Sequence, residues 1–93
     1  MELSYSLLRN IEKSQGGSFY LLDTEQFSKN YNELIDAFRS IYPKTFIAYS
    51  YNTNYIPRLC QLVDELGGYA EIVSDMEYEI TKRLSMPTEK VHF

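Results

Sequence analysis

The sequence predicts an α/β fold with parallel strands and about three βα units. Short apolar runs alternate with segments of helical periodicity, giving the order strand, helix, strand, helix, strand, helix, strand from about residue 19 onward. This order is typical of right-handed βαβ units, which place their strands side by side in a parallel sheet. Hydrophobic residues make up 44% of the 93 residues, so we expect an ordered chain with a core.

The first expected elements are a helix and a short strand. Residues 2–13 place leucine and isoleucine at near-helical spacing and predict an amphipathic helix that ends before a glycine pair. Residues 19–22 form an apolar, aromatic run that predicts a strand ending at Asp23. We therefore expect residues 1–17 to be a helical lead-in and residues 18–93 to form the α/β segment.

A long amphipathic helix and a second strand come next. Asp23 or Thr24 can cap the helix, and Pro43 marks its end. Its apolar stripe includes Phe27, Tyr31, Leu34, Ile35 and Phe38. Residues 46–51 then form a continuous strand-like run, which fits a parallel strand covered on both faces.

The last third of the chain predicts two more helices and two more strands. One helix has Pro57 in its first turn and ends at a glycine pair. Residues 69–73 predict a buried strand, and residues 90–93 begin a further one. Between them, Ser74 and Glu77 have the spacing of a capping box that opens a third helix.

Composition excludes several classes of partner. The net charge of −4 provides no basic field that would attract nucleic acid or an anionic membrane, so we expect neither. No apolar run approaches the roughly 18 residues of a membrane-spanning helix, and the first residues lack the features of a secretory signal. These observations predict a cytoplasmic protein. Cys60 is the single cysteine, which rules out an internal disulfide, and its apolar helical setting predicts a core residue.

Five short motifs follow one another along the predicted strands and helices. They are Phe19-Tyr20-Leu21-Leu22-Asp23, Tyr49-Ser50-Tyr51-Asn52-Thr53-Asn54, Leu66-Gly67, Glu71-Ile72-Val73-Ser74-Asp75-Met76-Glu77 and Val91-His92-Phe93. In order and spacing they resemble the patterns F-Y-x-x-D, Y-S-x-K-x-N, L-G, E-V-V-S-x-x-E and I-x-F of the pyridoxal-phosphate (PLP) amino-acid decarboxylases of the diaminopimelate and ornithine decarboxylase family. The resemblance covers about residues 18–93. It implies that the α/β segment is the N-terminal part of a (β/α) TIM barrel, and that the family's cofactor is PLP.

The chain departs from the family at its most informative position. Asn52 stands where the family has the lysine of Y-S-x-K-x-N, which forms a Schiff base with PLP. An amide nitrogen cannot form that imine, because its lone pair is delocalised, whereas a deprotonated lysine amine can. None of the five lysines is expected at a strand's carboxyl end near the site; they are Lys13, Lys29, Lys44, Lys82 and Lys90. The departure predicts no covalent PLP and no decarboxylase activity in this chain alone.

Two acidic residues match further positions of the family. Glu71 matches an acidic residue near the cofactor, and Glu77 matches one at the edge of the site. Glu77 also suits the capping box with Ser74, and this structural role is the favoured one. Glu71 lies within a strand that is expected to be buried, where a carboxylate needs a polar partner whether its role is structural or functional. The sequence therefore favours neither role for Glu71.

Other polar and aromatic residues near the strand ends have structural explanations. Tyr49 and Tyr51 suit packing, and Asn54 suits capping. His92 is the only histidine and can act as an acid or base near neutral pH, but no nucleophile or metal partner accompanies it in the sequence. A structural role is therefore favoured for all four.

Two functions compete at this point. The first is a part of a PLP-dependent carboxy-lyase that acts on diaminopimelate, ornithine or a related amino acid, with its reactive lysine replaced by Asn52. The second is a noncatalytic binding or scaffold module that keeps the family's fold. A reading frame that continues into a phosphate-binding loop and a β domain would favour the first. The determinants of substrate choice lie mainly outside these residues.

The strand count predicts self-association. About four parallel strands leave unpaired N–H and C=O groups at the sheet edges, because a closed barrel of this kind has eight strands. Two-fold pairing is the commonest closed arrangement of identical chains. We expect a homodimer or higher oligomer, with residues 46–51 and 90–93 close to the interface.

Overall fold

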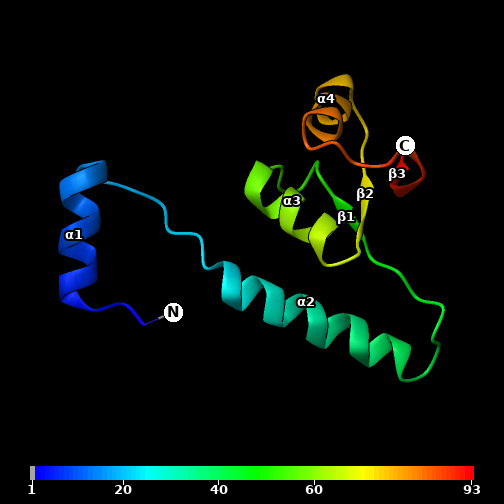
Figure 1. Cartoon of the computed structure of the whole chain (residues 1–93), viewed down its shortest axis with the longest axis horizontal. Coiled ribbons are helices and arrows are strands. Elements are labelled where there is room, and N and C mark those ends of the chain that lie inside the picture. Colours follow the sequence, from blue (N-terminus) through cyan, green and yellow to red (C-terminus); the bar gives the residue numbers. More distant parts are fainter. Residues whose placement is uncertain (1) are drawn as a thin grey trace.

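The structure is a computed structural model that describes residues 2–93 as three parallel strands and four α-helices (Figure 1). The elements in chain order are α1 (Tyr5–Gln15), α2 (Thr24–Arg39), β1 (Ala48–Ser50), α3 (Pro57–Glu65), β2 (Tyr69–Glu71), α4 (Asp75–Arg83), the 3₁₀ turn η1 (Thr88–Lys90) and β3 (Val91–His92). The strands lie in the order β1-β2-β3, and both pairings are parallel. The expected α/β class and the parallel sheet are confirmed.

Local sequence signals explain where the helices begin and end. The Ser4 side chain accepts a hydrogen bond from the Leu7 amide at the start of α1, and Asp23 does the same for Gln26 at the start of α2. Pro57 occupies the first turn of α3, where its missing N–H costs nothing. Gly16 follows α1 with φ at 95°, in the left-handed region that glycine adopts without strain.

The register determines which side chains share a face of the sheet. Tyr49 pairs with Ala70, which pairs with Val91, and these residues face the helices. Their neighbours along each strand point to the opposite side. We call that side the open face; it carries Phe46, Ala48, Ser50, Tyr69, Glu71, Val73 and His92.

The core lies between the sheet and helices α2, α3 and α4, in two clusters of buried side chains. One cluster joins Tyr51, Cys60, Ala70, Ile72 and Met86. The other joins Tyr31, Ile35 and Val63 and links α2 to α3. Cys60 is fully buried, as its apolar setting predicted. Within residues 2–93, no helix is long and apolar enough to cross a membrane.

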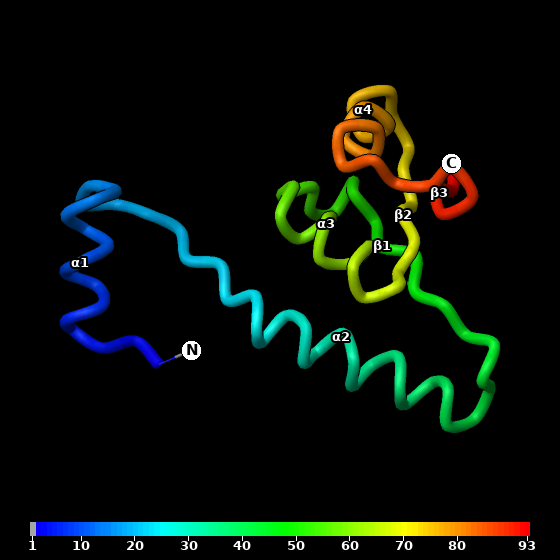
Figure 2. The backbone as a smooth tube through the Cα atoms, viewed as in Figure 1, coloured from blue at the N-terminus to red at the C-terminus, as the bar shows by residue number. Residues whose placement is uncertain are grey.

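Two expectations about strands were wrong. Residues 19–22 form no strand; they run through the extended connection between α1 and α2, away from β1 (Figure 2). A strand needs the backbone of a neighbour for its hydrogen bonds, and this segment has none beside it. Residues 46–51 do not lie in a strand covered on both faces either, because Ala48 and Phe46 on the open face are exposed to solvent.

Candidate functional site

A row of three polar side chains crosses the open face near the carboxyl ends of the strands. Ser50 of β1 is in register with Glu71 of β2, and Glu71 is in register with His92 of β3. Neighbouring strands lie about 4.8 Å apart, so a hydroxyl, a carboxylate and an imidazole are adjacent on one face. Ser50 and Glu71 are half-buried and His92 is exposed, so the row is accessible to solvent.

An aromatic row runs alongside this polar row. The Phe46 and Tyr69 ring centroids are 5.3 Å apart, and the Tyr69 and His92 rings stack at 5.4 Å with an interplanar angle of 27°. The Arg39 guanidinium lies 5.5 Å from the centre of the Phe46 ring. The stacking on Tyr69 orients the imidazole of His92, which is therefore held in place beside Glu71.

Asn52 lies in the turn that directly follows β1, two residues beyond Ser50, and it is exposed. This is the carboxyl end of β1, the place where α/β sheets gather their functional groups. The position is therefore suited to a reactive group. The residue that occupies it provides an amide, which can form hydrogen bonds but cannot act as a nucleophilic amine.

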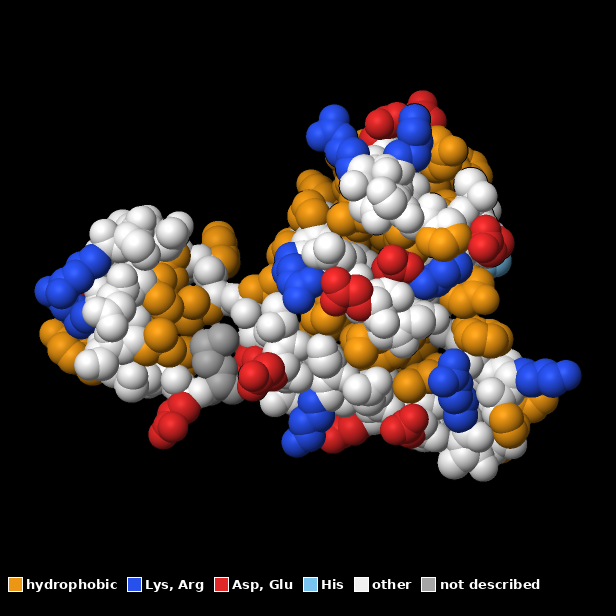
Figure 3. Space-filling model, in the orientation of Figure 1, with side chains coloured by type: hydrophobic (Ala, Val, Ile, Leu, Met, Phe, Trp, Pro, Cys, Tyr) orange, Lys and Arg blue, Asp and Glu red, His pale blue; other side chains and the backbone are white. Residues whose placement is uncertain are grey.

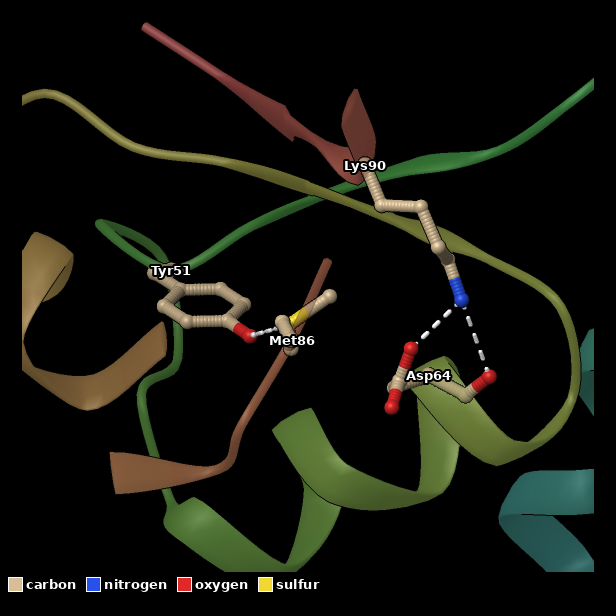
Figure 4. A network of polar contacts seen from close by, with 4 residues as sticks. All are labelled: Tyr51, Asp64, Met86 and Lys90. Atoms are coloured by element: carbon tan, nitrogen blue, oxygen red, sulfur yellow. Dashed lines mark hydrogen bonds and ion pairs between the residues drawn. The ribbon is translucent and has the colours of Figure 1, made fainter. Parts of the chain in front are cut away.

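Lys90 lies just before β3 and pairs with Asp64. Its Nζ contacts the Asp64 carboxylate at 2.5 Å and the Asp64 carbonyl oxygen at 3.2 Å (Figure 4). Asp64 lies in the last turn of α3, whose C-terminal end leads into the start of β2. The Lys90 amine is thus paired at the amino end of the sheet, opposite Asn52.

Glu77 lies in the first turn of α4 and is buried, with 3% of its surface exposed. The Ser74 hydroxyl accepts a hydrogen bond from the Glu77 amide at 3.2 Å and donates one to Glu77 Oε2 at 2.5 Å. The bond from the Glu77 amide is the N-cap half of the capping box that the Ser-x-x-Glu spacing predicted, whereas the Glu77 carboxylate accepts from the Ser74 hydroxyl. Glu77 Oε1 is buried and has no hydrogen-bond partner among the described residues.

We expect Ser74→Ala to lower the free energy of unfolding by about 1–2 kcal/mol, because it removes the helix cap and the partner of the buried Glu77 carboxylate. Ser74→Thr, which keeps the hydroxyl, should cost less than about 0.5 kcal/mol. Urea unfolding followed by circular dichroism measures both. Equal losses for the two variants would show that the hydroxyl does not hold Glu77.

Three other residues near the strand ends have structural roles, as expected. Tyr51 is buried and donates a hydrogen bond to Met86 Sδ at 3.0 Å (Figure 4), and burial raises the pKa of its phenol above the ordinary value. Tyr49 packs edge-on against Phe27 with ring centroids 6.2 Å apart. Asn54 accepts a hydrogen bond from the Ile56 amide at 3.1 Å, just before α3.

The structure brings together residues that the sequence did not connect. Nothing in the sequence connects Glu71 with His92, yet their strands pair so that the two lie side by side. Periodicity predicts that both segments are strands but does not set the register between them. The described part of the chain holds no group of three or more His, Cys, Asp or Glu side chains placed to bind a metal ion.

The order of strands and helices makes this an α/β protein. Comparison with known protein sequences shows which proteins the chain resembles. The chain is 31% identical over 85 residues to a diaminopimelate decarboxylase of Aquifex aeolicus, and 33% identical over 82 residues to one of Methanocaldococcus jannaschii. These alignments cover 90% and 84% of this chain but 19% of each relative, so the chain spans about a fifth of their length. No family model matches, and no solved structure gives a significant match. The chain is thus similar to a part of diaminopimelate decarboxylases.

Proposed function

We propose that this chain is an N-terminal barrel segment of the PLP-dependent decarboxylase type that does not catalyse decarboxylation by itself. The observation that carries the proposal is Asn52, an exposed amide at the carboxyl end of β1, where the motif of the family has its lysine. The partial match to diaminopimelate decarboxylases and the three parallel strands support the barrel origin. The substrate class would be amino acids such as diaminopimelate or ornithine.

Covalently bound PLP does not fit the residues present. A Schiff base needs a free amine close to the strand ends. Asn52 supplies an amide there, and Lys90 is paired with Asp64 at the other end of the sheet. These residues therefore support no chemical step through covalently bound PLP in this chain. The groups that remain at the strand ends are those of Ser50, Glu71 and His92, which can bind a polar ligand or hold a proton.

A noncatalytic scaffold module derived from the same family is the second candidate. The open face and the unpaired side of β1 favour it, because they leave hydrophobic side chains and backbone groups available to another chain. The two candidates differ in what a restored lysine would do. In a catalytic segment the amine at position 52 would form a Schiff base with PLP even without turnover, whereas in a scaffold it would be an ordinary surface lysine.

The test of the proposal is CO2 release from diaminopimelate, ornithine, lysine and arginine in the presence of PLP. We expect no release above the rate of PLP alone for the chain itself, because it offers no amine at the strand ends. Asn52→Lys should also fail to turn over, since one lysine does not supply phosphate and substrate contacts. Thr53→Lys, the adjacent exposed position, is the matched control.

Two results would contradict the proposal. Turnover by the unmodified chain would show that another group replaces the lysine. Turnover by Asn52→Lys, but not by Thr53→Lys, would show that the remaining residues already form a complete site.

A further inference from the structure

Strand β3 carries His92 of the strand-end row, yet few contacts hold this strand to the sheet. It has two residues, and it pairs with β2 through Ala70 with Val91 and Glu71 with His92. The Ile72 amide donates to the His92 carbonyl at 2.9 Å. Val91 packs against the core cluster that contains Ala70 and Ile72. Because the strand is so short, a further contact is needed to set its position along β2.

The side chains of β3 and its neighbours permit one competing register. A shift by one residue would turn Val91 away from the core, which the alternation of the strand disfavours. A shift by two residues keeps the faces and can put Phe93 in the place of Val91. Phe93 is apolar and 91% exposed, so this register would bury it. It would also carry His92 about 6.6 Å along the sheet, away from Glu71. The opposite shift would bring the charged Glu89 to the core.

The pair of Lys90 with Asp64 distinguishes between the two registers. Lys90 directly precedes β3, and its Nζ donates to the Asp64 carboxylate at 2.5 Å and to the Asp64 carbonyl oxygen at 3.2 Å (Figure 4). The carbonyl lies in the last turn of α3, where the helix dipole also favours a cation. The shift that buries Phe93 would move the Lys90 backbone by about 6.6 Å, too far for the side chain to keep both contacts.

This pair is more shielded from water than the exposed ion pairs of the helices. Acidic and basic side chains are scattered over the visible surface of the molecule (Figure 3). Within residues 2–93, three other ion pairs each join two residues of a single helix, and their side chains are 43–56% exposed. The Lys90 and Asp64 side chains are 20% and 25% exposed, and they join residues 26 positions apart. Because solvent screens this pair less, it can contribute more than a surface pair.

We propose that Lys90 is a positioning residue whose pair with Asp64 sets the register of β3. The pair thereby holds His92 beside Glu71 and against the ring of Tyr69. It lies at the amino end of the sheet, and its effect reaches the strand-end row because β3 is only two residues long. In the competing register the row loses its imidazole. This role of Lys90 does not require the decarboxylase relationship.

The imidazole of His92 gives the readout, because it is the only histidine of the chain. Its ring stacks on Tyr69 with centroids 5.4 Å apart, so the tyrosine ring current shifts the imidazole proton signals in an NMR spectrum. Tyr69→Leu gives the positions of the unstacked signals. All spectra are recorded at about pH 8.5, where ordinary imidazole groups are neutral and ammonium and carboxylate groups are charged.

Lys90→Met removes the charge and keeps an unbranched side chain. We expect its His92 signals to move toward the Tyr69→Leu positions, because the loss of the pair should change the ratio of the two registers about tenfold or more. Lys90→Arg, which keeps the cation, should retain most of the stacked signal. Lys82→Met is the matched control, because it breaks the exposed pair with Glu79 and should leave the His92 signals unchanged.

Phe93→Ser tests the choice of register itself, because it removes the apolar side chain that the competing register would bury. Lys90→Met combined with Phe93→Ser should recover the stacked His92 signals, which a pair that only fastens β3 would not produce. Circular dichroism checks that each variant keeps its helices. Fully stacked signals in Lys90→Met alone would overturn the proposal. An unstacked His92 or an unfolded chain in both Lys90→Met and the double variant would also overturn it, because the pair would then fasten β3 or the whole fold without selecting the register.

Discussion

Replacing Ile72 with alanine should lower the free energy of unfolding by about 2–5 kcal/mol. Ile72 has 1% of its surface exposed and packs in the cluster that contains Tyr51, Cys60 and Met86. Removing three methyl or methylene carbons from this site loses their transfer free energy and leaves a cavity. The loss is large against the roughly 5–15 kcal/mol that stabilises a small domain. Urea unfolding followed by circular dichroism measures it.

Val73→Ala is the control for this substitution, because Val73 is the next residue but points to the open face and is 54% exposed. We expect it to cost less than about 0.5 kcal/mol, as surface substitutions usually do. If Val73→Ala lowered the free energy of unfolding as much as Ile72→Ala, the open face would be packed in solution. Both faces of the sheet would then be covered.

Gly68→Ala should destabilise the chain by about 2–3 kcal/mol, which is near the upper end for overpacking a core. A Cβ atom at Gly68 would lie 2.5 Å from Val63 Cγ1, 2.9 Å from the Tyr31 hydroxyl oxygen and 3.1 Å from the Val63 carbonyl oxygen. The hydroxyl end of the Tyr31 side chain can shift. Val63 cannot shift as easily, because it is buried and its carbonyl belongs to the backbone of α3. The contact between α2, α3 and the start of β2 must therefore open.

Gly17→Ala provides the comparison for Gly68→Ala. A Cβ atom at Gly17 would meet nothing within 4 Å, and its backbone is not in the left-handed region. Its effect on the melting temperature should be negligible or slightly stabilising, because alanine restricts the unfolded chain. If Gly68→Ala melted at the same temperature as Gly17→Ala, the close approach of α2 and α3 would not persist in solution.

Local sequence signals predicted most of the elements. Each of these signals involves residues close together in the sequence: the caps at Asp23 and Ser74, the proline at position 57 and the apolar stripe of α2. The structure has a helix at each place that they indicate. Burial of Cys60 followed from its apolar neighbours for the same reason. These features depend on contacts between residues close in sequence.

Features that depend on distant partners were predicted less well. Residues 19–22 have the composition of a strand, but composition does not supply the neighbouring backbone that a strand requires. The row of Ser50, Glu71 and His92 depends on the register of three strands, which periodicity leaves open.

Borohydride reduction after incubation with PLP tests the absence of a Schiff-base lysine most directly. The chain is incubated with PLP, dialysed, reduced and digested, and the peptides are identified by mass spectrometry. We expect no residue to carry a near-stoichiometric pyridoxyl group, because Asn52 has no reactive amine and Lys90 is paired with Asp64. One lysine modified to near completion, with visible absorbance that survives dialysis, would contradict this account.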